Sequence, residues 1–267
     1  MYTYPETMGR VLNAMHNYDL WRKEARTPAA TPSGVHKEVA AGLLKSSRGM
    51  QSLGEAGARP LLQAYGIPVV QAASAGSSAE AAAAAAKIGF PVVMKVVSQD
   101  ILHKSDVGGI RLNLGTEAEV KHEYDLMMQQ FHLKMPRAKI EGVLIEQTAP
   151  HGQEVIIGMK RDPGFGPLLM FGLGGIYVEL FKDVAFRVAP VSAQEALQMV
   201  HETSAGRLLT GFRGQAKADL AAVVDCLCRI SQLSLDFPEI SEIEVNPLQV
   251  FAEGQGVLAL DARVIFE

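Results

Sequence analysis

The most informative stretch of this sequence is "VVMKVVSQDILHKSDVGGIRLNL", residues 92–114. Two apolar runs, 91–97 and 109–115, flank a polar loop that holds a histidine, a lysine, two serines and a Gly-Gly pair. Short apolar runs bounded by turn residues are typical of buried strands. The stretch therefore predicts two adjacent strands joined by a loop with many hydrogen-bond donors.

The loop, residues 98–109, has the donors of an anion clamp. Gly108 and Gly109 allow backbone N–H groups to approach a ligand closely. Lys95 ends the preceding strand, where its ammonium can meet a phosphate, much as a glycine-rich loop and a lysine hold nucleotide phosphates in kinases. The side-chain donors of the loop are Ser98, His103, Lys104 and Ser105. We interpret the set as a triphosphate site; the alternative is a solvated hairpin with ordinary surface charges.

The last two apolar stretches, "EIEVNPLQVF" and "GVLALDARV", carry candidate metal ligands. Glu244 and Asn246 fall on one side of a strand because side chains alternate, and Asp261 can project from the neighbouring final strand. Mg²⁺ prefers such oxygen ligands and usually sits between one or two carboxylates and nucleotide phosphates. The set predicts a magnesium site, the alternative being acids that simply face solvent.

Two further stretches add weaker candidates for nucleotide contacts. In "VLIEQTAPHGQEVIIG", Glu146 ends one apolar strand and Glu154 begins the next, where they can hold an adenine amino group and ribose hydroxyls. In "MFGLGGIYVE", Gly172, Gly174 and Gly175 let the main chain pass close to a phosphoryl group. The glycines do not complete the dinucleotide-binding fingerprint, and both acids can instead be rim residues.

Composition excludes several classes of function. With 25 Lys and Arg against 29 Asp and Glu, the net charge of -4 gives no footprint for nucleic acid. No apolar run approaches the ~20 residues that cross a bilayer. The amino terminus lacks the features of a signal peptide, so we expect a cytoplasmic protein.

Cys226 and Cys228 are i and i+2 in a helical pattern, which favours reduced packing residues over a disulfide or a metal chelate.

The order of predicted elements indicates an α+β fold with mixed or antiparallel sheets. Strands follow one another too often for a doubly wound nucleotide-binding fold. Helices are predicted over 10–22, 54–66, 77–89 and about 117–133, and within 193–203 and 217–237. Strands are predicted over 67–72, 91–97, 109–115, 141–149, 183–191, 239–251 and 256–266, with two more, joined by an Asp-Pro-Gly turn, inside 154–175.

The order of the motifs "KVVSQDILHKSDVGG", "EVIIGMKRDPGFGPLLMFGLGGIYVE", "FRVAP" and "EVNPLQV" resembles the ATP-grasp superfamily. The particular resemblance is to the nucleotide-binding beta subunit or domain of ADP-forming acyl-CoA (acetyl-CoA) synthetases, distant relatives of succinyl-CoA synthetase. It covers residues 46–267 and implies a two-lobed ATP-grasp fold. The small lobe would span about 66–147, and the large lobe 46–65 plus 148–267. Residues 1–45 would be a leader helix and linker.

The resemblance also implies roles for individual residues. Lys95 would contact the phosphates of ATP or ADP, and Glu146 and Glu154 the nucleoside. Asn246 and Asp261 would bind Mg²⁺. The catalytic residues would be Lys95, Glu244 and His103.

Glu244 would lie near the transferred phosphate. His103 stands where related synthetases place a second histidine that relays the phosphoryl group, with Asp106 as a possible orienting partner. An imidazole suits a relay because one nitrogen can attack phosphorus while the other is held by a carboxylate. The competing interpretation is that His103 only hydrogen-bonds phosphate.

The reaction of such enzymes is reversible: acyl-CoA, phosphate and ADP give the free acid, CoA and ATP through a phosphohistidine. The first phosphorylated histidine belongs to a CoA-binding alpha subunit or domain, which is not recognisable in this sequence, so we expect a hetero-oligomer. One alternative is an ATP-grasp ligase that joins a carboxylate to an amine, although that chemistry needs no histidine in the loop. Another is a non-catalytic nucleotide-sensing module of a larger acyl-CoA synthetase-like or acetyltransferase protein.

Overall fold

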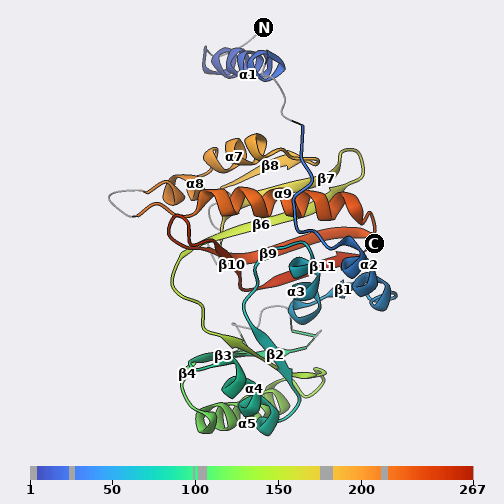
Figure 1. Cartoon of the computed structure of the whole chain (residues 1–267), viewed down its shortest axis with the longest axis vertical. Coiled ribbons are helices and arrows are strands. Elements are labelled where there is room, and N and C mark those ends of the chain that lie inside the picture. Colours follow the sequence, from blue (N-terminus) through green and yellow to red (C-terminus); the bar gives the residue numbers. More distant parts are fainter. Residues whose placement is uncertain are drawn as a thin grey trace.

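The computed structural model describes residues 5–23, 28–98, 100–101, 107–174, 183–211 and 216–266. Within them the chain forms a larger and a smaller lobe, and helix α1 (Pro5–Lys23) stands apart at one end (Figure 1). Each lobe has its own sheet and its own hydrophobic cluster. The strand pairs of both sheets are antiparallel, which confirms the predicted α+β class.

The larger lobe is built on a sheet of seven described strands in the order β1-β11-β9-β6-β7-β8, with β10 paired to β9. The strands are β1 (Ser52–Leu53), β6 (Gln153–Asp162), β7 (Gly166–Leu173), β8 (Val184–Val188), β9 (Ile240–Val250), β10 (Val257–Ala259) and β11 (Ala262–Phe266). The helices are α2 (Lys37–Ser46), α3 (Glu55–Ala64), α7 (Ala193–His201), α8 (Ser204–Leu209) and α9 (Leu220–Asp236).

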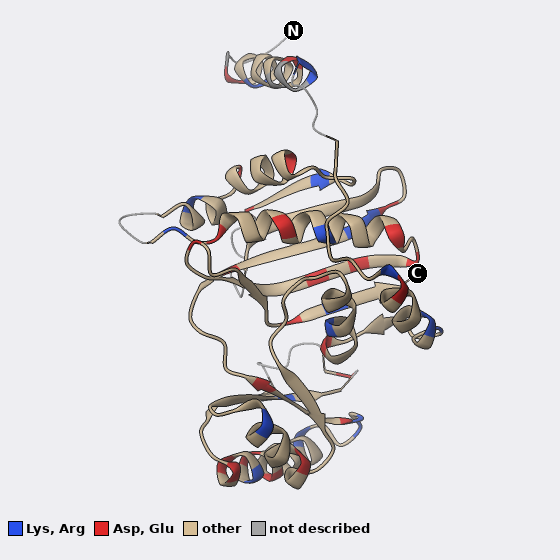
Figure 2. Cartoon of the chain, in the orientation of Figure 1, with Lys and Arg blue, Asp and Glu red and all other residues tan. Residues whose placement is uncertain are grey.

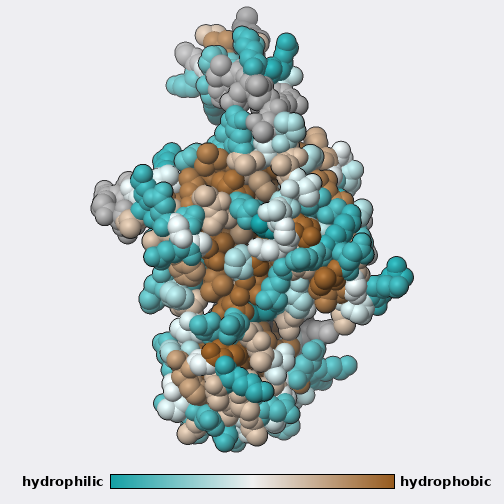
Figure 3. Space-filling view, viewed as in Figure 1, coloured by the Kyte–Doolittle hydropathy of each residue, from teal (hydrophilic) through white to brown (hydrophobic). Residues whose placement is uncertain are grey.

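Side-chain alternation gives this sheet two different faces. Ile243 and Val245 are buried in the core cluster that includes α9, and Glu242 and Glu244, which alternate with them along β9, lie on the other face. Helices α7, α8 and α9 cover the first face (Figure 1). On this side of the molecule, apolar surface extends from the larger lobe to the junction of the lobes (Figure 3). At β9, the second face therefore presents polar side chains.

The smaller lobe has a sheet in the order β2-β5-β3-β4 and two helices. Its elements are β2 (Ala72–Ala75), α4 (Ser78–Ile88), β3 (Val92–Val97), β4 (Ile110–Leu114), α5 (Glu117–Lys134) and β5 (Gly142–Gln147). Ser77 caps α4 by accepting from the Glu80 N–H. Met94 and Ile145 pack in the lobe's core, so their chain neighbours Lys95 and Glu146 point from the opposite face.

The chain crosses between the lobes just before β2, and the predicted strand over 67–72 is wrong in its bounds. The Val70 N–H donates to the Ala259 carbonyl at 3.2 Å, and the Ala259 N–H donates to the Pro68 carbonyl at 2.8 Å. Those backbone groups bond the larger lobe, so they are not available to the smaller sheet. The first backbone bond to β5 is at Gln71, whose carbonyl accepts from the Gln147 N–H at 2.9 Å, and the strand register begins with Ala72 opposite Glu146.

The carboxyl-terminal strand predicted over 256–266 is two strands, β10 and β11. The break falls at Leu260 and Asp261, which bond an irregular part of β9. The Leu260 N–H donates to the Pro247 carbonyl at 3.0 Å, and the Asn246 N–H donates to the Asp261 carbonyl at 3.1 Å. The break brings Asn246 and Asp261 side by side.

Two helices among the described residues, α2 and α8, were not predicted from the sequence. Helix α2 lies in the stretch assigned to the linker, and its Ala40 and Leu44, one turn apart, are buried in the core of the larger lobe. Helix α8 follows α7 after a short break. Among the described residues, no helix has both the length and the apolar character needed to cross a bilayer.

The buried ring of Phe171 on β7 provides a test of the larger core. Phe171→Ala is expected to lower the free energy of unfolding by about 3–5 kcal/mol, because it removes a fully buried ring and leaves a cavity. Phe165→Ala is the matched control, since that ring is 73% exposed at the turn before β7. Chemical denaturation followed by circular dichroism measures both; equal effects would contradict this packing.

Candidate functional site

Four charged side chains are buried together at the junction of the lobes. Lys95 comes from β3 and Glu146 from β5 in the smaller lobe, whereas Glu55 and Arg59 come from α3 in the larger lobe. Their exposed fractions are 9%, 3%, 5% and 7%, respectively. Charged residues are seldom buried unless they are paired, so the cluster is a candidate functional site. Figure 2 shows acidic segments on both sides of this junction.

The cluster is tied together by direct contacts across the lobes. The Lys95 Nζ donates to Glu55 Oε1 at 2.9 Å and to the Leu260 carbonyl at 3.0 Å, and pairs with Glu146 Oε2 at 2.8 Å. The Arg59 Nη2 donates to Glu55 Oε1 at 2.7 Å and also to Glu146 Oε1. Helix α3 is thereby bonded to two strands of the other lobe.

Burial and neighbouring charges shift two pKa values in the cluster. Burial acts to lower the pKa of Lys95, but the carboxylates of Glu55, Glu146 and Asp261 outweigh it and leave this pKa above its ordinary value. Burial, followed by the hydrogen bond with Glu55, raises the pKa of Glu146 to about 8, although Lys95 and Arg59 act to lower it.

The pKa values of Lys95 and Glu146 are both raised, which the ion pair between them does not explain. Such a pair should lower the pKa of the carboxyl group. The charges of the whole cluster reconcile them. Three acids, Glu55, Glu146 and Asp261, surround two bases, Lys95 and Arg59. One proton shared by the hydrogen-bonded Glu55 and Glu146 makes the group neutral, which a buried site favours. We therefore assign the proton to this carboxyl pair at neutral pH.

The candidate metal ligands Asn246 and Asp261 lie beside the cluster. Their backbones are hydrogen-bonded, and Asp261 is close enough to Lys95 to raise its pKa. Among the described residues, no group of three or more His, Cys, Asp and Glu side chains could hold a metal ion. One carboxylate and one amide nevertheless fit Mg²⁺, which commonly takes few protein ligands and fills its other positions with phosphate oxygens and water.

Glu244 and Glu154 occupy the larger sheet. Glu244 lies on the face opposite the core, directly across from Arg263, whose Nη2 donates to it at 3.1 Å. Burial alternates from Ile243 to Asn246, so Glu244 and Asn246 share a face as predicted, before the irregularity at Pro247. Glu154 is exposed near the start of β6. The described contacts of Glu154 involve its backbone carbonyl, which accepts from Gly174 at 3.1 Å.

The polar loop is described only at its ends. His103, Lys104, Ser105 and Asp106 lie outside the described residues, as does Gly175. At the near end, Ser98 Oγ accepts from the Asp100 N–H at 3.2 Å.

At the far end, Gly108 has φ +72°, a conformation that favours glycine. Its carbonyl accepts from Arg111 Nη1 at 2.7 Å, while the carbonyl of Gly109 accepts from the Val96 N–H at 2.8 Å. Because Ile110 is opposite Lys95 in the sheet, the loop returns beside the buried lysine.

Close packing accounts for Gly172 and Gly174, two of the glycines named as candidates from the sequence. A Cβ at Gly174 would lie 2.7 Å from the carbonyl carbon of Val155, and one at Gly172 would lie 2.7 Å from the Asp183 carbonyl oxygen. A larger residue at either position would push backbone against backbone. Strand packing therefore requires glycine at both positions.

Glu55 and Arg59 are the members of the cluster that the sequence analysis missed. They stand at i and i+4 in "GEAGARPLLQAYG", where opposite charges share a helix face. That face also carries Leu62, which is fully buried. Charges of opposite sign on a buried helical face were the signal that could have identified them.

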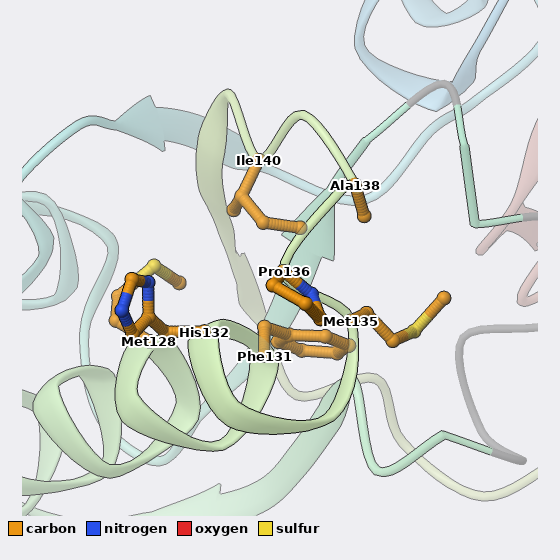
Figure 4. Close-up of a pocket in the computed structure, with 7 residues that line it drawn as sticks. All are labelled: Met128, Phe131, His132, Met135, Pro136, Ala138 and Ile140. Carbon is orange, nitrogen blue, oxygen red and sulfur yellow. The ribbon is translucent and has the colours of Figure 1, made fainter.

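The described structure has cavities in the smaller lobe and at the lobe junction. One, of about 220 Å³, is lined by side chains at the end of α5 and the segment after it, including Phe131, Met135 and Ile140 (Figure 4). It contains no candidate site residue. The other, of about 460 Å³, lies at the lobe junction, lined by Arg59, Val70 and residues of β2, among others. Its size is within the range of small-molecule sites.

The geometry places a buried lysine of one lobe against acidic residues of the other, with the terminal strands beside them. A family model for the ATP-grasp domain matches residues 45–266. The chain belongs to the ATP-grasp family. The two-lobed ATP-grasp fold with antiparallel sheets is thus confirmed, and the chain is homologous to the nucleotide-binding beta component of ADP-forming acetyl-CoA synthetases.

Among its relatives, the beta subunit of acetate–CoA ligase (ADP-forming) I from Pyrococcus furiosus is 44% identical over 208 residues, 78% of this chain and 89% of that subunit. Acetate–CoA ligase (ADP-forming) I from Archaeoglobus fulgidus is 48% identical over 206 residues, 77% of this chain but only 30% of that ligase. This ATP-grasp chain therefore spans less than a third of the longer ligase.

A solved structure of similar shape is the dinucleotide forming acetyl-coenzyme A synthetase 1 of Ca. Korarchaeum cryptofilum. Its matching chain superimposes with a TM-score of 0.81 and 44% identity, covering 85% of this chain and 100% of that one. That protein was solved in complex with coenzyme A and Ca-AMPCP. The described lobes thus have a close counterpart in a nucleotide-bound relative.

The shared proton leads to a prediction about pH. The pKa of Glu146 rises from an ordinary 4.5 to about 8 on folding, so the folded state holds a proton that the unfolded state releases. This group therefore destabilises the folded state increasingly as pH rises from 4.5 to 8. Glu146→Gln fixes the neutral form, so its free energy of unfolding relative to wild type is expected to increase between pH 5.5 and 8.5.

Denaturant unfolding of both proteins at the two pH values measures this difference. Glu202→Gln, an acid paired with Arg187 on the surface of the larger lobe, controls for the loss of a carboxylate. A relative stability that falls with rising pH for Glu146→Gln would show that Glu146 is folded as a carboxylate.

Proposed function

We propose that this chain is the nucleotide-binding beta component of an ADP-forming acyl-CoA synthetase. It would carry out Mg²⁺-dependent, reversible phosphoryl transfer between ATP or ADP and a phosphohistidine, coupled to acyl-CoA formation or cleavage. One observation carries the proposal: Lys95 of the smaller lobe lies against Leu260 and the candidate metal ligand Asp261 of the larger lobe. A phosphate-binding cation and a magnesium site at one junction suit a nucleotide triphosphate.

The residues at the junction would act by position and charge. Lys95 would neutralise phosphate oxygens as charge moves during transfer, and Asn246 and Asp261 would hold Mg²⁺. Bound Mg²⁺ supplies further neutralisation of the phosphates and leaves coordination positions for their oxygens. Glu146 and Glu154 remain proposed nucleoside contacts, and Ser98, Gly108 and Gly109 proposed phosphate contacts. We likewise propose Lys104, Gly174 and Gly175 as nucleotide contacts.

A histidine would carry the phosphoryl group. We propose His103 as the relay and Glu244 as the carboxylate near the transferred phosphate. The Korarchaeum synthetase was also solved with Mg-AMPPCP and with its phosphohistidine segment pointing towards the nucleotide binding site. The matching chain of that structure is 41% identical to this chain.

The complete reaction would need a CoA-binding alpha subunit or domain that carries its own phosphorylatable histidine. The lengths of the relatives support this division: the chain covers 89% of the Pyrococcus beta subunit but 30% of the Archaeoglobus ligase. We propose that the chain works in a hetero-oligomer or as one part of a fused enzyme. A cytoplasmic location stays a prediction from the sequence.

Labelling by ATP tests the histidine route. Incubation of the chain with γ-labelled ATP and Mg²⁺ is expected to leave an acid-labile, base-stable label on the protein, because phosphohistidine has that stability profile. His103→Ala should abolish this label and retain nucleotide binding. His151→Ala, which changes an exposed histidine before β6, is the control and should keep the label.

Binding of ATP without any label, even when the CoA-binding partner is added, would instead favour a nucleotide-sensing module. Label transferred to a small carboxylic acid as an acyl phosphate, with none on the protein, would favour a carboxylate–amine ligase.

Metal binding is tested at Asp261. Asp261→Asn removes the carboxylate charge and is expected to weaken nucleotide binding in Mg²⁺ by about tenfold or more, since a hydrogen-bonded charged contact is worth ~1.5–3 kcal/mol. Titration calorimetry with ATP, with Mg²⁺ and with EDTA, measures the change. The loss should appear only when Mg²⁺ is present; an equal loss in EDTA would remove Asp261 from the metal site.

A further inference from the structure

The ammonium of Lys95 is held mostly by the lobe to which it does not belong. A lysine has three N–H donors, and here they face Glu55, Glu146 and the Leu260 carbonyl. Glu146 lies on the strand next to Lys95 and moves with the same sheet. Glu55 and Leu260 belong to the larger lobe, so the position of the Lys95 ammonium depends on the relative orientation of the two lobes.

Arg59 fixes both acids that meet the lysine. Its Nη2 contacts Glu55 and Glu146, while its Nη1 donates to the Val70 carbonyl at 2.6 Å. Val70 is part of the segment that crosses between the lobes. A guanidinium is planar and always charged, so it can hold three acceptors in a fixed arrangement that a lysine could not reproduce.

Stability alone is a poor explanation for this arrangement. Burying ion pairs costs desolvation free energy, and apolar residues of similar volume often stabilise a protein as well or better. The four charges of the cluster lie where the lobes meet rather than in either hydrophobic core. A desolvation cost of this kind is expected at a functional site, where particular charges must be held in position.

We propose that Glu55 and Arg59 are positioning residues for phosphoryl transfer, which hold the Lys95 ammonium in its working place only when helix α3 and the smaller sheet are in contact. The inference rests on the proposed function. It couples closure of the lobes to placement of the phosphate-binding cation, so that an open molecule has a misplaced lysine. Protein kinases use a comparable pair, a strand lysine held by a helix glutamate, to build a competent phosphate site.

Glu55 is the key member because a single oxygen, Oε1, accepts from both Lys95 and Arg59. Replacement by glutamine keeps the size and removes the charge. The ammonium then loses its charged anchor on α3 and can shift along the junction. A shift of about 1 Å in a catalytic group can cost ~100-fold in rate.

The test compares the single-turnover rate of labelling by γ-labelled ATP with the Kd for Mg·ATP measured by calorimetry. Glu55→Gln is expected to slow labelling ~100-fold and to change the Kd much less, since the rest of the nucleotide site is intact. In a Lys95→Met background, Glu55→Gln should cause no further slowing, because the residue it positions is gone. Glu202→Gln, whose pair with Arg187 lies within the larger lobe, should leave the rate unchanged.

Two charge-preserving variants distinguish a loss of lysine positioning from a folding defect. Glu55→Asp withdraws the carboxylate by one methylene, and Arg59→Lys cannot bridge both acids and the Val70 carbonyl. Both are expected to slow labelling with little loss of thermal stability. A merely structural role predicts a lower melting temperature and a slowing that multiplies with that of Lys95→Met.

The outcomes separate the two proposals. Folded Glu55 and Arg59 variants that label at the wild-type rate, or a double variant slower than Lys95→Met alone, would overturn the positioning role and leave the proposed function standing. A wild-type chain that binds no Mg·ATP would overturn the proposed function and the positioning role together.

Discussion

The ion pair between Lys95 and Glu55 is the contact on which the arrangement of this molecule depends. It joins a strand of the smaller lobe to a helix of the larger lobe in a buried place, at 2.9 Å. Arg59 and Glu146 complete the charge balance, and one shared proton leaves the group neutral. Because unpaired buried charges are costly, the lobes cannot separate at this point without solvating or replacing these partners.

Each sheet contributes to this place through the same alternation of side chains. In the smaller lobe, Met94 and Ile145 face helices while Lys95 and Glu146 face the junction. In the larger lobe, Ile243 and Val245 are in the core while Glu244 lies on the opposite face. The break between β10 and β11 then sets Asp261 beside Asn246. Both sheets thus have one face against an apolar core and another face that carries charged side chains.

Local patterns were enough to predict much of this from sequence. The strands around the polar loop, the capped helix α4 and the shared face of Glu244 and Asn246 depend on nearby residues. The bounds of β2 and the break before β11 depend on backbone bonds to distant segments, at Ala259 and Asn246, which no local pattern reveals. The contact between Glu55 and Lys95 likewise joins residues 40 positions apart in sequence, although the pairing of Glu55 with Arg59 on one helix face is a local pattern. The predicted role of His103 falls outside the described residues.

A crystal structure of the chain with Mg²⁺ and a non-hydrolysable ATP analogue is the most direct measurement of whether nucleotide and metal meet at the lobe junction. We expect the phosphate chain to contact Lys95 Nζ in place of one of its three protein acceptors, with Mg²⁺ bound by Asn246 and Asp261. Density for the nucleotide away from the junction, or a metal that touches neither of these residues, would contradict the site proposed from the geometry.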